Sequence, residues 1–452
     1  MNVTPFVHEG LGNSSYLVEV GDGEAMVIDP DRAIARYVAA AEARGRRIVA
    51  AFETHLHADF VSGATALAAG SDATAYVPHG AEARFPHQPL AAGQRVRLAG
   101  VEVEAIASPG HTPEHLSHLL RRPAGPPLLF SGGSLLAGGA ARTDLIAPEQ
   151  TEALTRAQYA TITTAFAALP DETLLLPTHG GGSFCSAGAG AERTSTLGRE
   201  RASNLLLAVP DVEMFVRDFP RTFPAAPEYF FRLRAVNQAG PRLRREIPLP
   251  RPLSPETFAA ASGDALVVDV RPKEAYHVGH IPGALSIPFR DAYATWLGWL
   301  TPAETPLRFV TDGVPLERVV DESLLVGYER FAGWLDGGMA AWAAAGLPLR
   351  RSPLVQAAAA RAQLLAGALA LDVREPGEYA AGHLPEALHV PLGRLAGELS
   401  RLPRDRPLVV YCGHGERAAT AVSLLERAGF AGPLLNLDGG IGSWIAAGLS
   451  AA

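Results

Sequence analysis

The chain has 452 residues, enough for two to four domains that each bury a core. Apolar residues make up 48% and charged residues 19%, a globular balance that excludes an intrinsically disordered chain. The net charge of −8, with no basic cluster large enough to override it, argues against a nucleic-acid partner.

The sequence also indicates the cellular compartment of the protein. Two cysteines cannot make a disulfide framework, so we expect a reducing environment. Residues 1–6 lack the charged and then apolar pattern of a signal peptide. The longest apolar stretch, residues 354–371, is interrupted by Gln356, Arg361 and Gln363, which makes it too polar to span a bilayer. We therefore expect a cytoplasmic protein with no membrane partner.

The chain begins with elements typical of a mixed α/β sheet. Strand-like runs at residues 15–20 and 25–30 flank the glycine-rich turn 21–23 and predict a β-hairpin. A helix over about 32–44 and a strand over 48–52 follow.

The histidines of this N-terminal part fall in Gly/Pro-rich turns, each after an apolar run. The first turn carries His55, His57 and Asp59, and two later turns carry His111 and His179. Because such loops converge at one edge of a sheet, we expect these side chains to lie close together. Imidazoles and a carboxylate in one place suit a divalent transition metal.

This arrangement, over residues 1–205, resembles the metallo-β-lactamase fold, an αββα sandwich, and is most similar in pattern to the persulfide dioxygenases. The resemblance implies a mononuclear Fe(II) site in which His55 and His111 are two of the ligands. It places His57, Asp59 and His179 beside them in the cavity, where they are available as additional ligands.

Two departures from the family pattern bear on the metal. Gly133 stands where the resemblance places an aspartate ligand, and Phe60 stands where two-metal hydrolases carry another histidine. The loss of both disfavours a two-zinc hydrolase, and the glycine leaves the iron site short of an anionic ligand. Two interpretations stay open: an iron-dependent dioxygenase with altered ligation, or a scaffold that binds or docks a sulfur compound without oxidising it.

Residues 206–254 are rich in proline and carry the basic run 242–245. We interpret this segment as a solvated, semi-rigid connector between the N-terminal domain and the rest of the chain.

The C-terminal half contains an internal repeat with a domain-sized spacing of about 100 residues. Each copy alternates β-branched runs with helical stretches, which predicts a small parallel sheet covered by helices. Three motifs recur: Asp-x-Arg at 269–271 and 372–374, Gly-His-Ile/Leu-Pro at 279–282 and 382–385, and Leu-Asp-Gly-Gly before a tryptophan at 335–342 and 437–444.

The two copies resemble rhodanese domains, over residues 255–350 and 355–452. The first copy has Thr-Asp-Gly-Val-Pro at 311–315 and no cysteine, so we predict that it transfers no sulfur and is retained for packing or docking. Asp372 and Arg374 resemble a structural pair of the family, and the turn histidines His280 and His383 occur even in the copy without cysteine. We therefore assign them structural roles.

The second copy places Cys412 between a strand-like run at 408–411 and a helix from about residue 418. Loop N–H groups and a helix N-terminus favour the thiolate, which is the nucleophilic form. We predict that Cys412 is the nucleophile and that Arg417 anchors the loop or binds an anionic acceptor. The substrate-binding loop between them comprises Gly413, His414, Gly415 and Glu416.

The predicted function is sulfane-sulfur metabolism. The iron site would oxidise a small persulfide to sulfite, and Cys412 would carry sulfur as a persulfide to sulfite, giving thiosulfate. Cys185 lies close after His179 in the sequence and is a candidate sulfur relay. Two alternatives remain: a sulfurtransferase whose N-terminal domain only binds or docks a partner, and a glyoxalase-like thioester hydrolase. The resemblance further implies a homo-oligomer.

Overall fold

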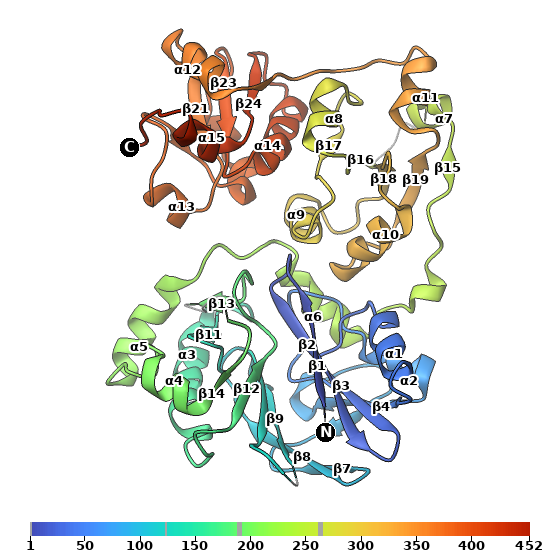
Figure 1. The fold of residues 1–452 in the computed structure, drawn as a ribbon, viewed down its shortest axis with the longest axis vertical. Helices are drawn as coiled ribbons and strands as arrows, with labels where there is room; N and C mark the ends of the chain where they lie inside the picture. The colour runs from blue at the N-terminus through green and yellow to red at the C-terminus, as the bar shows by residue number, and fades with distance from the viewer. Residues whose placement is uncertain (1, 123, 188–191, 261–264) are drawn as a thin grey trace. The chain divides into compact units, whose positions relative to one another are not determined.

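The computed structural model describes residues 2–122, 124–187, 192–260 and 265–452 (Figure 1). It divides into two compact units, Met1–Ile247 with Ser323–Gly327, and Pro248–Glu322 with Tyr328–Ala452. Over the described residues, every helix is too short or too polar to cross a bilayer.

Two six-stranded sheets pack face to face in the first unit. Tyr16 and Phe52 from one sheet share a buried core with Val103, Leu120 and Phe130 from the other. The first sheet has the order β1 (Val3–His8), β2 (Asn13–Gly21), β3 (Glu24–Ile28), β4 (Arg47–Phe52), β5 (Thr74–Pro78), β6 (Gln88–Leu90). The second has the order β14 (Ser195–Thr196), β12 (Leu174–Pro177), β10 (Leu128–Gly132), β9 (Leu116–Arg121), β8 (Val101–Ala107), β7 (Arg95–Leu98).

Helices cover the outer faces of both sheets. Tyr37 of α1 (Ala35–Glu42) and Leu67 of α2 (Ala64–Ser71) are buried against the first sheet. Ile162 and Phe215 are buried against the second. The helices on that side are α3 (Thr151–Ala160), the π-helical turn η3 (Thr161–Ala165), α4 (Leu197–Ser203) and α5 (Val212–Asp218). The layers are therefore helix, sheet, sheet, helix, which confirms the predicted αββα fold (Figure 1).

The predicted local elements of this unit match the structure closely. The hairpin joins β2 to β3, and Asp22 and Gly23 at its turn have φ values of 47° and 76°. Such left-handed turn residues suit the right-handed twist of the two strands. The shorter elements are η1 (His79–Ala81), η2 (Pro148–Gln150), η4 (Phe219–Thr222), η5 (Arg244–Glu246), and the β11 (Ala140–Ala141) and β13 (Ser186–Ala187) pair.

The segment predicted to be a connector is mostly part of the first unit, which extends to Ile247. It contains α5 and α6 (Phe230–Ala239), and the apolar side chains of Phe215 and Leu233 are buried. From α6, the Asn237 amide donates to the backbone carbonyls of His57 and Phe60, both at 2.8 Å. The segment therefore helps to hold the first histidine turn in place.

The second unit contains two five-stranded parallel sheets of the same topology, one for each repeat (Figure 1). The first has the order β15 (Pro252–Leu253), β19 (Phe331–Leu335), β18 (Leu307–Val310), β16 (Leu266–Asp269), β17 (Leu285–Ser286). The second has the order β20 (Leu354–Val355), β24 (Leu434–Leu437), β23 (Leu408–Tyr411), β21 (Leu369–Asp372), β22 (Leu388–His389).

Helices surround these parallel sheets, as the alternating pattern predicts. In the first repeat they are α7 (Pro255–Ala260), α8 (Lys273–Val278), α9 (Tyr293–Leu300), α10 (Leu316–Leu325) and α11 (Gly338–Ala344). In the second they are α12 (Ala357–Leu365), α13 (Pro376–Ala380), η6 (Leu392–Gly397), η7 (Leu399–Arg401), α14 (Glu416–Arg427) and α15 (Gly440–Ala446).

The repeated Asp-x-Arg motifs are buried ion pairs in both domains. Arg271 contacts Asp269 at 2.6 Å, and Arg374 contacts Asp372 at 2.6 Å. The turn histidines bond to backbone carbonyls through Nδ1: His280 to Tyr276 at 2.9 Å and His383 to Tyr379 at 3.2 Å. Each contact lies within its own domain, as expected for residues that shape the fold.

Candidate metal centre and sulfur-transfer site

The N-terminal histidine turns meet at one edge of the αββα sandwich. His55, His57 and Asp59 follow β4, His111 lies between β8 and β9, and His179 follows β12. Each of these five side chains is buried. The structure thus brings together all five residues that the sequence predicts for this cavity.

Three of the imidazoles form a compact group. His55, His111 and His179 each offer a ligand atom, and these atoms lie within 4.8 Å of one another. The Nε2 atoms of His55 and His179 are 3.3 Å apart. Two ligand atoms on one tetrahedral metal, each at about 2.1 Å, are about 3.4 Å apart. The spacing of this pair therefore fits a shared metal ion.

Neighbouring groups fix the tautomers of two of these rings. The Thr54 hydroxyl donates to Asp29 at 2.8 Å, so it accepts from Nδ1 of His55 at 2.9 Å. Nδ1 of His111 donates to the backbone carbonyl of Arg142 at 2.6 Å. In both rings Nε2 is left with a lone pair, the form in which histidine binds metal.

His179 is oriented by two oxygen atoms on its far side. Its Nδ1 lies 3.2 Å from Oδ1 of Asn13 and 3.1 Å from Oδ2 of Asp59. Although burial opposes ionisation, His179 lowers the pKa of Asp59 to about 2. A carboxylate behind a histidine ligand is a common support of metal sites because it fixes the ring and raises its basicity.

The electrostatics of the cavity favour neutral imidazoles. Burial, followed by the neighbouring His179, lowers the pKa of His111 to about 3. Burial and the surrounding histidines likewise lower the pKa of His55 well below its usual value. Since only the unprotonated ring can donate a lone pair, both side chains are ready to bind a cation at neutral pH.

His57 has a different environment from its neighbours. Its Nε2 lies 2.9 Å from Oε2 of Glu53 and 3.3 Å from Oδ1 of Asp29, and its ring stacks on Phe60 at 4.2 Å. Although burial opposes it, the charge of Asp29 and then that of Glu53 raise the pKa of His57 to about 10. In this arrangement His57 is a buried cation paired with Asp29 rather than a neutral ligand, while burial raises the pKa of Glu53.

Gly133 lies against the histidine cluster. A Cβ atom added there would sit 2.5 Å from Cδ2 of His111, and its backbone N–H donates to Nε2 of His115 at 2.9 Å. The His115 ring in turn stacks on His55 at 5.0 Å. Imidazole rings thus fill the space that an aspartate at this position would need. His115 and His118 are both buried, as expected of packing histidines.

Cys185 is fully buried in the first unit. Burial and the neighbouring charge of Asp59 raise the pKa of its thiol well above the usual value. The protonated thiol is the unreactive form, so this environment does not favour nucleophilic transfer. Its role as a sulfur relay remains a prediction.

The residues that support this cluster were not predicted from the sequence. Asp29 follows β3 and accepts hydrogen bonds from Thr54 and Thr178, while Glu53 immediately precedes the first histidine turn. The sequence did contain a sign of Asp29, because it is an acidic residue directly after an apolar strand. The contribution of Asn13, from the distant strand β2, had no such sign in the sequence.

The sulfur-transfer site lies at the carboxyl end of β23. Cys412 is 1% exposed, and its Sγ accepts a hydrogen bond from the backbone N–H of Gly415 at 3.0 Å. Helix α14 begins at Glu416, two residues before the predicted start. Gly415 has a φ of 106°, which an L side chain rarely adopts, so glycine permits this close turn.

The Arg417 side chain lies beside Gly413 of the loop and reaches α13. Its two terminal nitrogens each lie 2.6 Å from a different oxygen of Glu378. Although burial opposes it, this pairing and the nearby Cys412 raise the pKa of Arg417. The contact supports an anchoring role, while binding of an anionic acceptor remains a prediction. Glu378 was not anticipated, since its position in the first repeat is occupied by Ala275.

The rest of the predicted loop lines the approach to Cys412. Gly415 is buried, Gly413 and Glu416 are half-buried, and His414 is exposed. The backbone of α15 closes the other side, where a Cβ on Gly440 would sit 2.2 Å from the Cys412 carbonyl oxygen.

The corresponding position in the first repeat is Thr311, directly after β18. The next residue, Asp312, accepts a hydrogen bond from the backbone N–H of Met339 at 3.2 Å. The loop is therefore held in place, but it offers no thiol.

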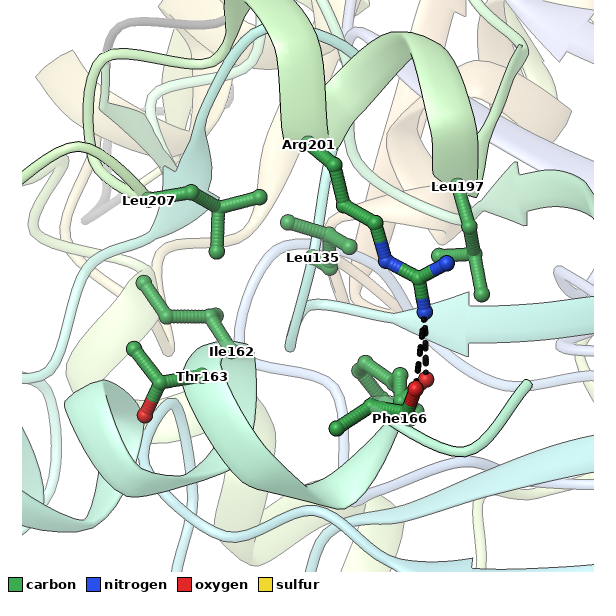
Figure 2. Close-up of a pocket in the computed structure, with 8 residues that line it drawn as sticks. Leu135, Ile162, Thr163, Phe166, Leu197, Arg201 and Leu207 are labelled. Atoms are coloured by element: carbon green, nitrogen blue, oxygen red, sulfur yellow. Dashed lines mark hydrogen bonds between the residues drawn. The ribbon is translucent and has the colours of Figure 1, made fainter. Parts of the chain in front are cut away.

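A separate pocket of about 340 Å³ opens on the first unit among η3, α4 and the loops beside them (Figure 2). Its lining is largely apolar, with Leu135, Ile162 and Leu207 among the labelled residues. The Arg201 guanidinium donates to the backbone carbonyls of Phe166 and Ala167, at 2.9 and 3.3 Å. These bonds satisfy backbone carbonyls just after η3, and we therefore assign Arg201 a structural role.

Comparison with known families agrees with this division. The description "Rhodanese-like domain" matches residues 254–345 and 356–447, and "Metallo-beta-lactamase superfamily" matches residues 8–179. The N-terminal part of the chain is thus a metallo-beta-lactamase domain, followed by tandem rhodanese-like domains.

Among curated relatives, a sulfurtransferase of Allochromatium vinosum is 41% identical over 81 residues, 18% of this chain and 75% of that protein. The thiosulfate sulfurtransferase GlpE of Pseudomonas syringae pv. syringae is 35% identical over 95 residues, 21% of this chain and 86% of that protein. A hydroxyacylglutathione hydrolase of Nitrosococcus oceani is 35% identical over 172 residues, which cover 37% of this chain and only 62% of the hydrolase.

Among solved structures, a metallo-beta-lactamase from Staphylococcus aureus subsp. aureus COL aligns with a TM-score of 0.67 at 29% identity. The alignment covers 74% of this chain and 98% of that one. The similarity therefore extends well beyond the N-terminal domain.

Proposed function

Because the chain belongs to the rhodanese family of sulfurtransferases and carries a metallo-beta-lactamase domain at its N-terminus, we propose that it oxidises and transfers the sulfane sulfur of small persulfides. The observation that carries this proposal is the 3.0 Å contact between Cys412 Sγ and the Gly415 N–H, at the start of α14. A backbone donor and a helix N-terminus stabilise the negative sulfur that the transfer requires.

In the transfer reaction, the Cys412 thiolate attacks the outer sulfur of a persulfide R–S–SH. The S–S bond of the donor breaks, the thiol R–SH leaves, and Cys412 holds the sulfur as Cys–S–S⁻. Sulfite then attacks the outer sulfur, thiosulfate departs with it, and the thiolate is restored. The Gly415 N–H lies where it stabilises the negative charge on Sγ before and after transfer.

The metallo-beta-lactamase domain would supply the sulfite. Its overall reaction, R–S–SH + O₂ + H₂O → R–SH + SO₃²⁻ + 2 H⁺, transfers four electrons from the outer sulfur to oxygen. Fe(II), held by His55, His111 and His179, would supply binding sites for the sulfur and for O₂. The protein's own contribution is to keep Nε2 of His55 and His111 unprotonated and to bury all three rings away from water.

The arrangement of the ligands supports a single metal rather than two. A second set, His57, Asp59 and His179, also lies within 4.8 Å, but it shares His179 with the first set. Filling it would require His57 to leave Asp29, which would abandon a buried ion pair, and a third set, Asp29, Glu53 and His57, contains that same ion pair. Two-metal hydrolysis therefore has the larger structural cost.

The proposal is tested by measuring iron content, O₂ uptake and sulfur transfer in three proteins: the wild type, Cys412→Ser and His111→Ala. With glutathione persulfide, we expect the wild type to contain about one iron per chain, to consume O₂, and to produce sulfite and thiosulfate. Cys412→Ser should keep O₂ uptake and accumulate sulfite, while His111→Ala should lose iron and O₂ uptake but keep transfer from thiosulfate to cyanide. Wild-type protein that holds iron yet consumes no O₂ with any persulfide would refute the dioxygenase half.

A second candidate for the N-terminal domain is thioester hydrolysis, which the names of relatives such as the Nitrosococcus oceani protein favour. Two zinc ions per chain and cleavage of S-lactoylglutathione would identify it. A metal-free protein with sulfur transfer alone would instead indicate a domain that binds or docks a sulfur compound.

A further inference from the structure

The sulfur-transfer loop is contacted from the neighbouring domain that lacks the cysteine. His277 of α8 places Nε2 at 2.9 Å from Nδ2 of Asn436 in β24. The same Nδ2 donates to the Gly415 carbonyl at 3.0 Å. Gly415 in turn donates its N–H to Sγ of Cys412. One short chain of contacts therefore links a histidine of the cysteine-free domain to the reactive sulfur.

The direction of each hydrogen bond in this chain follows from the groups involved. An amide nitrogen is a donor only, so Nε2 of His277 must accept from Asn436. Its Nδ1 then carries the proton and donates to the Ser352 hydroxyl at 2.7 Å. His277, Ser352 and Asn436 are all buried, at 4%, 5% and 0% exposure. The histidine is thus held in one orientation and one tautomer.

A second side chain of α8 contacts the same glycine. A Cβ on Gly415 would lie 2.8 Å from Cε of Lys273, so the lysine stem packs directly on the glycine Cα. The Lys273 ammonium pairs with Oδ1 of Asp438 at 3.2 Å, which ties the stem to the end of β24. Gly415 is therefore restrained on its carbonyl side by Asn436 and on its Cα side by Lys273.

Comparison of the two repeats separates these contacts from the residues that shape the fold. The Asp-x-Arg, tyrosine and turn-histidine positions are the same in both copies. Lys273 and His277 are not, because the second copy has Pro376 and Ala380 in their places. The two residues that reach the Cys412 loop are thus specific to the domain without cysteine.

We propose that the cysteine-free domain takes part in sulfur transfer by positioning the Gly415 peptide, with His277 and Lys273 as positioning residues. His277 orients Asn436, and Asn436 and Lys273 together aim the Gly415 N–H at Sγ of Cys412. The inference rests on the proposed transfer at Cys412, although the property it concerns, the acidity of that thiol, is measurable without any turnover.

The test is the pH dependence of Cys412 alkylation by iodoacetamide in the full chain. Mass spectrometry of the peptides distinguishes Cys412 from the buried Cys185. Three variants are compared with the wild type: His277→Ala, His277→Gln and Glu426→Ala. The glutamine keeps an acceptor near the position of Nε2. Glu426→Ala is the matched control, since it removes the 2.9 Å contact with His280 between the same two domains, about 15 Å along α14 from the loop.

We expect His277→Ala to raise the thiol pKa of Cys412 by roughly half a unit to one unit, the effect of losing one oriented hydrogen bond. Sulfur transfer near pH 7 should fall roughly three- to tenfold and approach the wild-type rate at high pH. His277→Gln and Glu426→Ala should stay close to the wild type.

An unchanged thiol pKa in folded His277→Ala would overturn the inference, as would an equal shift in Glu426→Ala. If His277→Ala does not fold, a folded His277→Gln in which the pKa of the Cys412 thiol is raised by half a unit or more would overturn it too. A wild type that transfers no sulfur but shows the predicted pKa shifts would refute the proposed transfer and leave the positioning role standing.

Discussion

Acidification should destabilise the second unit because His277 is buried as a neutral ring. Burial, followed by the charge of His280, lowers its pKa to about 4, against about 6.5 in an unfolded chain. Lys273 also opposes protonation, whereas the hydrogen bond to Ser352 and the charge of Glu426 favour it. Between these two pKa values the unfolded chain binds the extra proton, so stability is complete above pH 6.5 and falls as the pH decreases. The slope is about 1.4 kcal/mol per pH unit, which gives a loss of about 2 kcal/mol at pH 5 and about 3 kcal/mol at pH 4.

Urea unfolding followed by tryptophan fluorescence measures this loss in the relevant part of the chain, because all five tryptophans lie between residues 296 and 444. The wild type and His277→Gln are compared at pH 7 and pH 5. We expect the glutamine variant, which has no group to protonate, to lose about 2 kcal/mol less than the wild type on acidification. Equal losses in the two proteins would refute the assignment of His277 as a neutral acceptor.

Three further predictions concern the metal cavity. His57→Ala leaves the buried Asp29 carboxylate without its cation, so metal-depleted protein should lose about 3–5 kcal/mol in chemical denaturation; a loss below about 1 kcal/mol would contradict the ion pair. Asp59→Asn removes the charge behind His179 and should weaken metal binding about 10- to 100-fold in a competition titration, whereas an unchanged affinity would exclude that support. Gly133→Asp should lower the metal content measured by elemental analysis, because the new Cβ collides with His111; a gain of metal would show that the cavity can accept the carboxylate.

Much of the fold was predictable from the sequence because it follows from local patterns. The hairpin around residues 21–23 and the strand before the first histidine turn depend on alternation and turn residues. The two parallel sheets follow from an internal repeat that is visible without any structure. The exception is residues 206–247, where proline content concealed buried aromatic side chains such as Phe215.

The candidate sites were predictable only in part, because their supporting residues come from distant elements. Motif spacing identified Cys412 and the five N-terminal ligand candidates. It could not identify Glu378, which meets Arg417 across 39 residues, or Asn436, which joins two domains. These partners are selected by packing, and packing leaves no periodic pattern in the sequence.

Asp59 is a buried carboxylate in the cavity where Gly133 provides none. Asp59 is ionised and 1% exposed, and a buried charge of this kind is costly unless a cation compensates it. Within the protein, the His179 imidazole 3.1 Å away is the group that most lowers the pKa of Asp59. A divalent ion on Nε2 of His179 would compensate the charge of Asp59 through the imidazole ring. The carboxylate would then lie behind a ligand, whereas the family pattern places it on the metal itself. The proposed three-histidine site would therefore keep a negative charge within reach of the metal, which would partly replace the carboxylate that Gly133 lacks.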